Sequence, residues 1–162
     1  VDVGGGSTEI SLISGGELKS SKSYDVGTVR MLKGTVRLQD AEALSRDLKA
    51  MSGEYPGMMI IGSGGNINKL FRLAEEKDLG ASVLPVESLK ALTEKLKKYD
   101  PKERERRFHL KPDRAEVIVP AAEIFLEVAR CSGAGLIWVP TIGLVDGIID
   151  SLYARKLGRK AD

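Results

Sequence analysis

Three consecutive glycines followed by two hydroxyl residues stand near the start of the chain, in the segment DVGGGSTE at residues 2–9. Glycine has no side chain and accepts positive φ, so a glycine turn between two strands can present its backbone N–H groups to a phosphate at close range. The two hydroxyls add further donors. The alternative interpretation is a glycine-rich hairpin without a ligand. We expect a phosphate-binding turn made of Gly4, Gly5, Gly6, Ser7 and Thr8.

Two carboxylates enclose this turn. Asp2 stands at the end of the first expected strand, where it could hold a divalent cation directly or through a water molecule. Glu9 comes just after the turn and could hold the metal or position a water. Ordinary surface carboxylates are the alternative, but their position on both sides of a glycine turn favours a site. Asp2 and Glu9 are therefore candidate catalytic and metal-binding residues.

A second glycine loop follows a short apolar run. Met58 to Ile61 reads as a buried strand, and a helix is expected from about Asn66. Free N–H groups at the start of that helix, together with its dipole, suit an anion. A plain strand-to-helix connection explains the loop equally well, although a second glycine loop in one chain favours a phosphate cleft. The candidate phosphate-binding residues here are Gly62, Ser63, Gly64 and Gly65.

Other phosphate-binding motifs are missing from the sequence. No GxxxxGK[ST] segment is present, so there is no P-loop lysine. Ile67 stands where a dinucleotide-binding fingerprint would have its third glycine after Gly62 and Gly64.

The elements that must position these residues follow from the spacing of apolar residues. The first three are strands at 1–4, 8–13 and 18–26, which form a meander with a hairpin turn at 14–17. Helices and strands then alternate. They are a helix at 40–51, a strand at 58–61, a helix at 66–74, a strand at 81–84, a helix from 85, charged helical turns at 101–108, a long helix from 113, a strand at 136–139 and a helix at 143–154.

This order, βββαβα, an insert, then αβα, indicates an α/β fold with a mixed sheet and helices on both of its faces. It is the order of the ribonuclease-H-like half that occurs twice in the actin, hexokinase and Hsp70 superfamily. Fold analogy alone does not establish a function.

Bulk composition narrows the class of protein. The chain has 162 residues, 42% of them hydrophobic, which fits one globular domain over residues 1–162. A formal net charge of +2 favours neither nucleic acid nor a membrane surface as a partner. Its single cysteine fits a reducing, cytoplasmic compartment. We expect no signal peptide, and no apolar run reaches the roughly 18 residues of a membrane helix. Because a strand is already under way at Val1, we expect an earlier lobe to hold half of the site.

Five segments together carry a resemblance to a known family. They are DVGGGSTE at 2–9, GTVRM at 27–31, GSGGNINKL at 62–70, DRAEVIVPA at 113–121 and VPTIGLVDGIIDSLY at 139–153. In this order they resemble the Ppx/GppA family over nearly the whole chain. The resemblance implies Mg²⁺-dependent hydrolysis of terminal phosphates from inorganic polyphosphate or of the 5′ phosphate of guanosine pentaphosphate. It also implies that this chain is the second lobe of a two-lobed enzyme.

The resemblance assigns roles to particular residues. It implies that Asp2 and Glu9 are essential acidic residues at the metal and the water, and that Gly4 to Thr8 hold phosphate. Arg114 matches a family arginine that meets the polyanion, and its fork of donors suits phosphate; a surface salt bridge is the open alternative. Arg30 is a weaker candidate of the same kind.

Two departures from the family pattern are visible. Many relatives have Gly-Thr where this chain has Gly65-Asn66, which puts the ligand of the second loop in doubt. The family's other catalytic glutamate, the general base, belongs to the first lobe. We therefore expect residues 1–162 alone to be nearly inactive.

Two other functions remain open at this point. One is an ATP-dependent small-molecule kinase of the same superfamily, which would transfer phosphate to an acceptor instead of water. The other is a non-catalytic module that binds polyphosphate or a nucleotide, or an actin-like filament. The apolar stripe of the last expected helix could dock on the first lobe or on a second copy in a homodimer.

Overall fold

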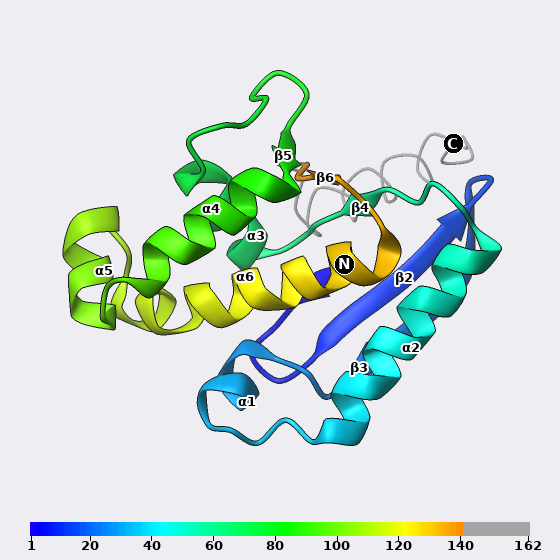
Figure 1. Cartoon of the computed structure of the whole chain (residues 1–162), viewed down its shortest axis with the longest axis horizontal. Helices are drawn as coiled ribbons and strands as arrows, with labels where there is room; N and C mark the ends of the chain where they lie inside the picture. Colours follow the sequence, from blue (N-terminus) through cyan, green and yellow to red (C-terminus); the bar gives the residue numbers. More distant parts are fainter. Residues whose placement is uncertain (141–162) are drawn as a thin grey trace, which may run out of the picture.

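The computed structural model describes residues 1–140, which form an α/β fold with two three-stranded sheets and six helices. Figure 1 shows the long helix α6 running through the middle of the molecule, with α4 on one side of it and α1 and α2 on the other. The elements in chain order are β1 (Asp2–Val3), β2 (Thr8–Ser14), β3 (Glu17–Tyr24), α1 (Thr28–Leu32), α2 (Leu38–Glu54), β4 (Ile60–Ile61), α3 (Gly65–Leu73), β5 (Val83–Pro85), α4 (Val86–Lys97), α5 (Pro101–Phe108), α6 (Pro112–Ser132) and β6 (Leu136–Trp138).

The first sheet is the expected antiparallel meander, in the order β1-β2-β3. Its hairpin turn uses Gly15 and Gly16, with φ of 61° and 76°. Positive φ at both central residues is the requirement of the tight turn whose twist matches the flanking strands. Thr8 and Ile10 are buried, whereas Glu9 between them is exposed, so the alternation of β2 fixes which side chains face solvent.

The second sheet has the order β4-β6-β5, with β6 parallel to β4 and antiparallel to β5. A single parallel bridge between Asp2 and Ser63 links the two sheets. The backbone N–H of Ser63 donates to the carbonyl of Val1 at 2.8 Å. The expected single mixed sheet is therefore two short sheets that meet at Asp2, since β1 and β4 have only two residues each.

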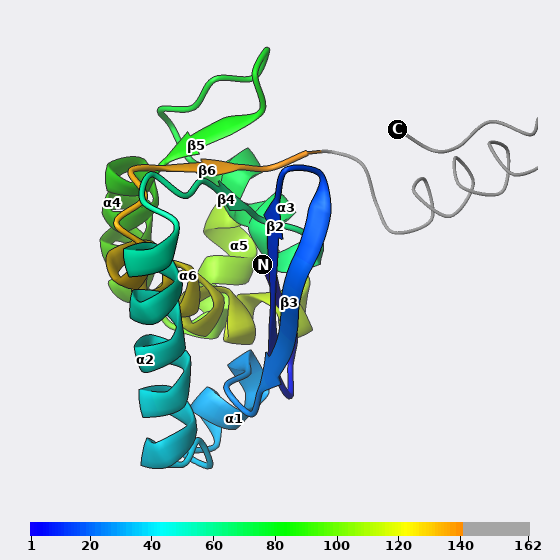
Figure 2. The same ribbon diagram turned by 90° about the vertical axis from the view of Figure 1, so that its right-hand side faces the viewer.

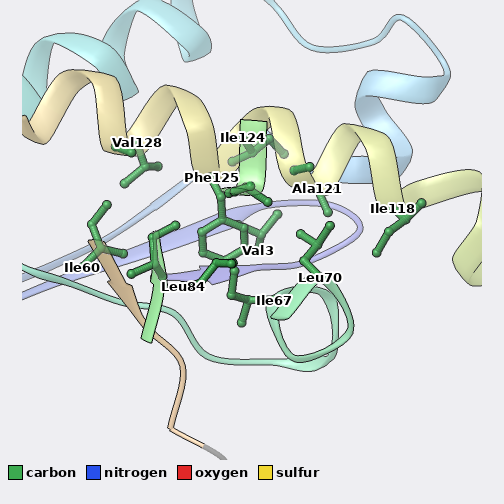
Figure 3. Packing of buried hydrophobic residues seen from close by; sticks show 14 of the residues in the cluster. Val3, Ile60, Ile67, Leu70, Leu84, Ile118, Ala121, Ile124, Phe125 and Val128 are labelled. Atoms are coloured by element: carbon green, nitrogen blue, oxygen red, sulfur yellow. The ribbon is translucent and has the colours of Figure 1, made fainter. Parts of the chain in front are cut away.

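The core forms around α6, which contacts α1, α2, α3, α4 and α5. Pro112 opens this helix, where its missing N–H is not needed, and Gly133 ends it with φ of 71°. Figure 3 shows the ring of Phe125 between the α6 backbone and the side chains of Val3 and Ile67. All three residues are buried, so the strand that carries Asp2 and the helix after the second glycine loop pack on the same helix.

Most expected elements are confirmed, with shifted ends. The helix expected at 40–51 is longer at both ends, and the helix α1, which overlaps the GTVRM segment, was not expected. The charged segment 101–108 is a regular helix because Asp100 and Glu103 form a capping box at its start. Figure 2 shows α2 and α6 on the same side of the β2–β3 ribbon. The helix expected at 143–154 lies outside the described residues. No helix within residues 1–140 is long and apolar enough to cross a membrane.

The carboxylate of Glu127 ties α2 to α6. It accepts hydrogen bonds from the Arg130 guanidinium, at 2.6 and 2.8 Å, and from the Ser45 hydroxyl at 2.8 Å. Hydrogen bonding to Arg130 is the main reason that the pKa of Glu127 falls from 4.5 to about 2, against the opposing effect of burial. The charged form is therefore stabilised by folding.

Glu127→Gln is expected to lower the free energy of unfolding by about 1 kcal/mol at neutral pH, after allowance for solvent screening. Because the folded pKa of Glu127 is depressed, this contribution is complete above pH 4.5 and disappears as the pH falls toward 2. Thermal unfolding of the two proteins between pH 7 and pH 3 measures it. Glu116→Gln, at an exposed position of α6 without an ion pair among residues 1–140, is the control. A difference for Glu127→Gln that does not depend on pH would contradict the prediction.

Candidate functional site

Asp2 and Glu9 are directly opposite each other in the β1–β2 pair. Both are exposed, while their neighbours Val3 and Thr8 are buried. Ser23 on β3 stands opposite Glu9, and Ser63 bridges to Asp2 from the other side. The two predicted carboxylates are thus brought together in one row of four polar residues, which crosses the first sheet and ends at Ser63.

Two carboxylates directly opposite in a sheet repel each other. The pKa of Asp2 is raised, first because its carboxylate is partly desolvated and second because of the negative charge of Glu9. A divalent cation between or beside them would remove this repulsion. Residues 1–140 contain no group of three potential metal ligands. A pair of carboxylates nevertheless fits Mg²⁺, which is commonly held by one or two carboxylates together with waters and substrate phosphates.

The Glu9 carboxylate is held by two hydroxyl groups. Ser7 Oγ donates to Glu9 Oε1 at 2.5 Å, and Ser23 Oγ donates to the same oxygen at 3.0 Å. In this structure the Ser7 hydroxyl therefore donates to Glu9. It is not the side-chain donor to phosphate that was predicted from the sequence. The backbone N–H of Ser7 takes no part in this hydrogen bond.

The triglycine turn has occupied carbonyls and free N–H groups. The carbonyls of Gly4 and Gly5 accept hydrogen bonds from the first N–H groups of α1, at 3.0 and 2.9 Å. Arg30 Nε donates to the Gly6 carbonyl at 2.7 Å. Within residues 1–140, the N–H groups of Gly5, Gly6 and Ser7 have no hydrogen-bond partner. The turn is thus fixed through its acceptors, and its donors remain available to an anion. Arg30, a weaker phosphate candidate from sequence, braces the turn.

Gly27 packs against the back of the turn. A Cβ atom at this position would lie 2.4 Å from the Gly5 oxygen and 2.5 Å from the Ser7 nitrogen, both of them backbone atoms. Its φ of −135° is open to any residue, so space and not conformation requires glycine here. The close approach of residue 27 is what lets the start of α1 reach the turn carbonyls.

Thr8 belongs to the core. Its side chain is fully buried, and Oγ1 donates to the Val26 carbonyl at 2.6 Å. This hydrogen bond fastens the segment after β3 to β2. The hydroxyl of Thr8 is therefore a structural group here and not the phosphate donor expected from the sequence.

The second glycine loop wraps around the Asp2 carboxylate. Gly64 has φ of 92°, and a Cβ atom there would lie 2.5 Å from Asp2 Oδ1. Gly65 begins α3, and its Cβ would lie 3.0 Å from a guanidinium nitrogen of Arg114. Gly62 is a packing position instead, since a Cβ there would lie 2.9 Å from the Ile67 side chain. The two predicted loops therefore meet at Asp2, with Ser63 exposed beside them.

Asn66 connects the parts of the site. Its buried side chain donates from Nδ2 to the Val3 carbonyl at 2.7 Å and accepts a short hydrogen bond at Oδ1 from Arg114 Nη1. Arg114 forms no ion pair with a carboxylate among residues 1–140, so the salt-bridge alternative is not realised there. The asparagine that departs from the family pattern holds the candidate arginine beside Gly65.

Three site residues were missed from the sequence: Ser23, Gly27 and Asn66. A two-residue turn at 15–16 alone would place Lys22 opposite Glu9, and a register shift within the hairpin brings Ser23 there instead. Gly27 and Asn66 act through contacts between segments that are distant in sequence. No local pattern indicates such contacts.

The profile of the Ppx/GppA phosphatase family matches residues 1–156. No curated protein matches the chain. The crystal structure of the type II variant of the Aquifex aeolicus Ppx/GppA phosphatase is similar, with 27% identity and a TM-score of 0.74 over 93% of this chain and 55% of that one.

A second solved structure has the same fold. It is an exopolyphosphatase from Cytophaga hutchinsonii ATCC 33406, with 21% identity and a TM-score of 0.73 over 98% of this chain and 56% of that one. The chain thus spans about half the length of these solved relatives. Since the family profile covers almost all of the sequence, the chain belongs to the Ppx/GppA phosphatase family.

Proposed function

We propose that this chain is one lobe of a Mg²⁺-dependent hydrolase that removes terminal phosphates from inorganic polyphosphate or from guanosine pentaphosphate. The observation that carries the proposal is the pair of opposed carboxylates, Asp2 and Glu9, between two glycine loops. The first of these loops has three N–H donors without a partner among residues 1–140. Membership of a phosphatase family and the likeness to an exopolyphosphatase support it. We further propose that the protein has a ribonuclease-H-like topology, is cytoplasmic and forms a homodimer.

Each group has a task that suits phosphoanhydride hydrolysis. The N–H groups of Gly5, Gly6 and Ser7 bind phosphate oxygens and stabilise the charge that these oxygens carry during transfer. Arg114, held by Asn66, offers its remaining donors to a neighbouring phosphate. Asp2 and Glu9 would hold Mg²⁺, which supplies positive charge to the phosphate. In this proposal, the base that activates the attacking water lies in the other lobe of the enzyme.

The proposal is tested by phosphate release from the full-length protein with Mg²⁺. The substrates are long-chain polyphosphate, guanosine pentaphosphate and ATP, each with and without an alcohol acceptor. We expect release from at least one of the first two without an acceptor, and no release after chelation of Mg²⁺. Turnover of ATP only in the presence of an acceptor would identify a kinase instead. Tight binding of polyphosphate without turnover would identify a binding module.

A further inference from the structure

The two hydroxyl groups on Glu9 come from different strands and reach the same oxygen. Ser7 lies at the end of the glycine turn, two residues before Glu9, and Ser23 lies on β3 directly opposite Glu9. Both donate to Oε1, and no donor within residues 1–140 contacts Oε2. A carboxylate oxygen has two lone-pair sites, so Oε1 is fully used while Oε2 stays open.

We propose that Ser7 and Ser23 are positioning residues, which fix the Glu9 carboxylate through Oε1 so that Oε2 is presented to the cation or to its bound water. The inference rests on the proposed function, because it gives Glu9 its role at a metal. Outer hydrogen bonds of this kind orient metal-binding carboxylates and raise the affinity for the metal. Without them, an exposed glutamate side chain would rotate freely about its terminal torsion.

The sheet itself does not require these hydrogen bonds. Pairing of β2 with β3 is made by the backbone ladder along the whole hairpin. The adjacent pair on the same face, Ser11 and Ser21, has hydroxyl groups 3.1 Å apart, with no carboxylate partner in the described part of the chain. Ser21 therefore offers a matched control: the same residue type and strand, equally exposed, and one pair away from Glu9.

The experiment is calorimetric titration of Mg²⁺ into the full-length protein without substrate. Ser23→Ala is expected to weaken Mg²⁺ binding about tenfold, since loss of such an outer partner has this order of effect. Ser21→Ala should bind Mg²⁺ like the wild type. Ser23→Thr keeps the hydroxyl and suits a strand, so it should restore most of the affinity. With polyphosphate at saturating Mg²⁺, KM of Ser23→Ala should change little.

Wild-type affinity in Ser23→Ala would overturn the inference, and so would equal losses in Ser21→Ala and Ser23→Ala. Failure of Ser23→Thr to rescue binding would also count against it, as would a wild-type protein that does not bind Mg²⁺. Failure of the proposed function looks different. In that case the wild type would bind Mg²⁺, Ser23→Ala would weaken binding, and neither protein would release phosphate.

Discussion

Glu9→Gln is expected to reduce phosphate release from polyphosphate about a thousandfold while leaving the fold intact. Glutamine keeps an oxygen that can accept from Ser7 and Ser23, so the local hydrogen bonds persist. It removes the negative charge that would hold Mg²⁺. It also removes the repulsion across the β1–β2 pair, which is worth about 0.5 kcal/mol. The melting temperature should therefore stay the same or rise slightly.

A loss of activity without a fall in melting temperature distinguishes a functional carboxylate from a structural one. Phosphate release and thermal unfolding are measured on the same preparation of the full-length protein. Glu17→Gln is the control, because Glu17 is exposed on the same sheet and, within residues 1–140, pairs only with Lys19. Activity within a few-fold of the wild type in Glu9→Gln would remove Glu9 from the site. A large fall in melting temperature would indicate that Glu9 supports the fold instead.

Gly27→Ala is expected to destabilise the protein by about 2 kcal/mol and to abolish most of its activity. The added methyl group would overlap the backbone of Gly5, Gly6 and Ser7, at 2.4 to 2.5 Å. A rigid backbone turn cannot move aside as a side-chain end can. The overlap can be relieved only if the turn moves away from α1. This movement would break the hydrogen bonds that orient the N–H groups of the turn.

Activity per folded molecule distinguishes this effect from simple unfolding. We expect kcat/KM for polyphosphate to fall at least tenfold at a temperature where circular dichroism shows Gly27→Ala to be folded. Gly53→Ala serves as the control, because a methyl group at this exposed position of α2 meets nothing within 4 Å. Alanine is also the better helix former, so this control should be slightly more stable than the wild type. Normal kcat/KM in Gly27→Ala would show that the turn tolerates displacement.

Local signals explain why much of the fold could be predicted. Alternation of buried and exposed residues along β2, and the glycine pair at 15–16, specify a meander without reference to the rest of the chain. Apolar spacing likewise specifies α6. The helix α1 was missed because its five residues are too few for periodicity to show. The single mixed sheet was expected from element order, and order does not reveal that the β1–β4 contact is one bridge long.

The sequence by itself determined the chemistry of the site. A glycine run between two carboxylates, followed by a second glycine loop, predicts a site for phosphate and a metal, because these residue types carry backbone donors and negative charge. Only the tertiary structure decided which groups are available. It buried the Thr8 hydroxyl, directed the Ser7 hydroxyl to Glu9, and recruited Ser23 and Asn66. A hydrogen bond depends on the distance between atoms in the folded chain, and that distance is set by packing across segments that the sequence keeps far apart.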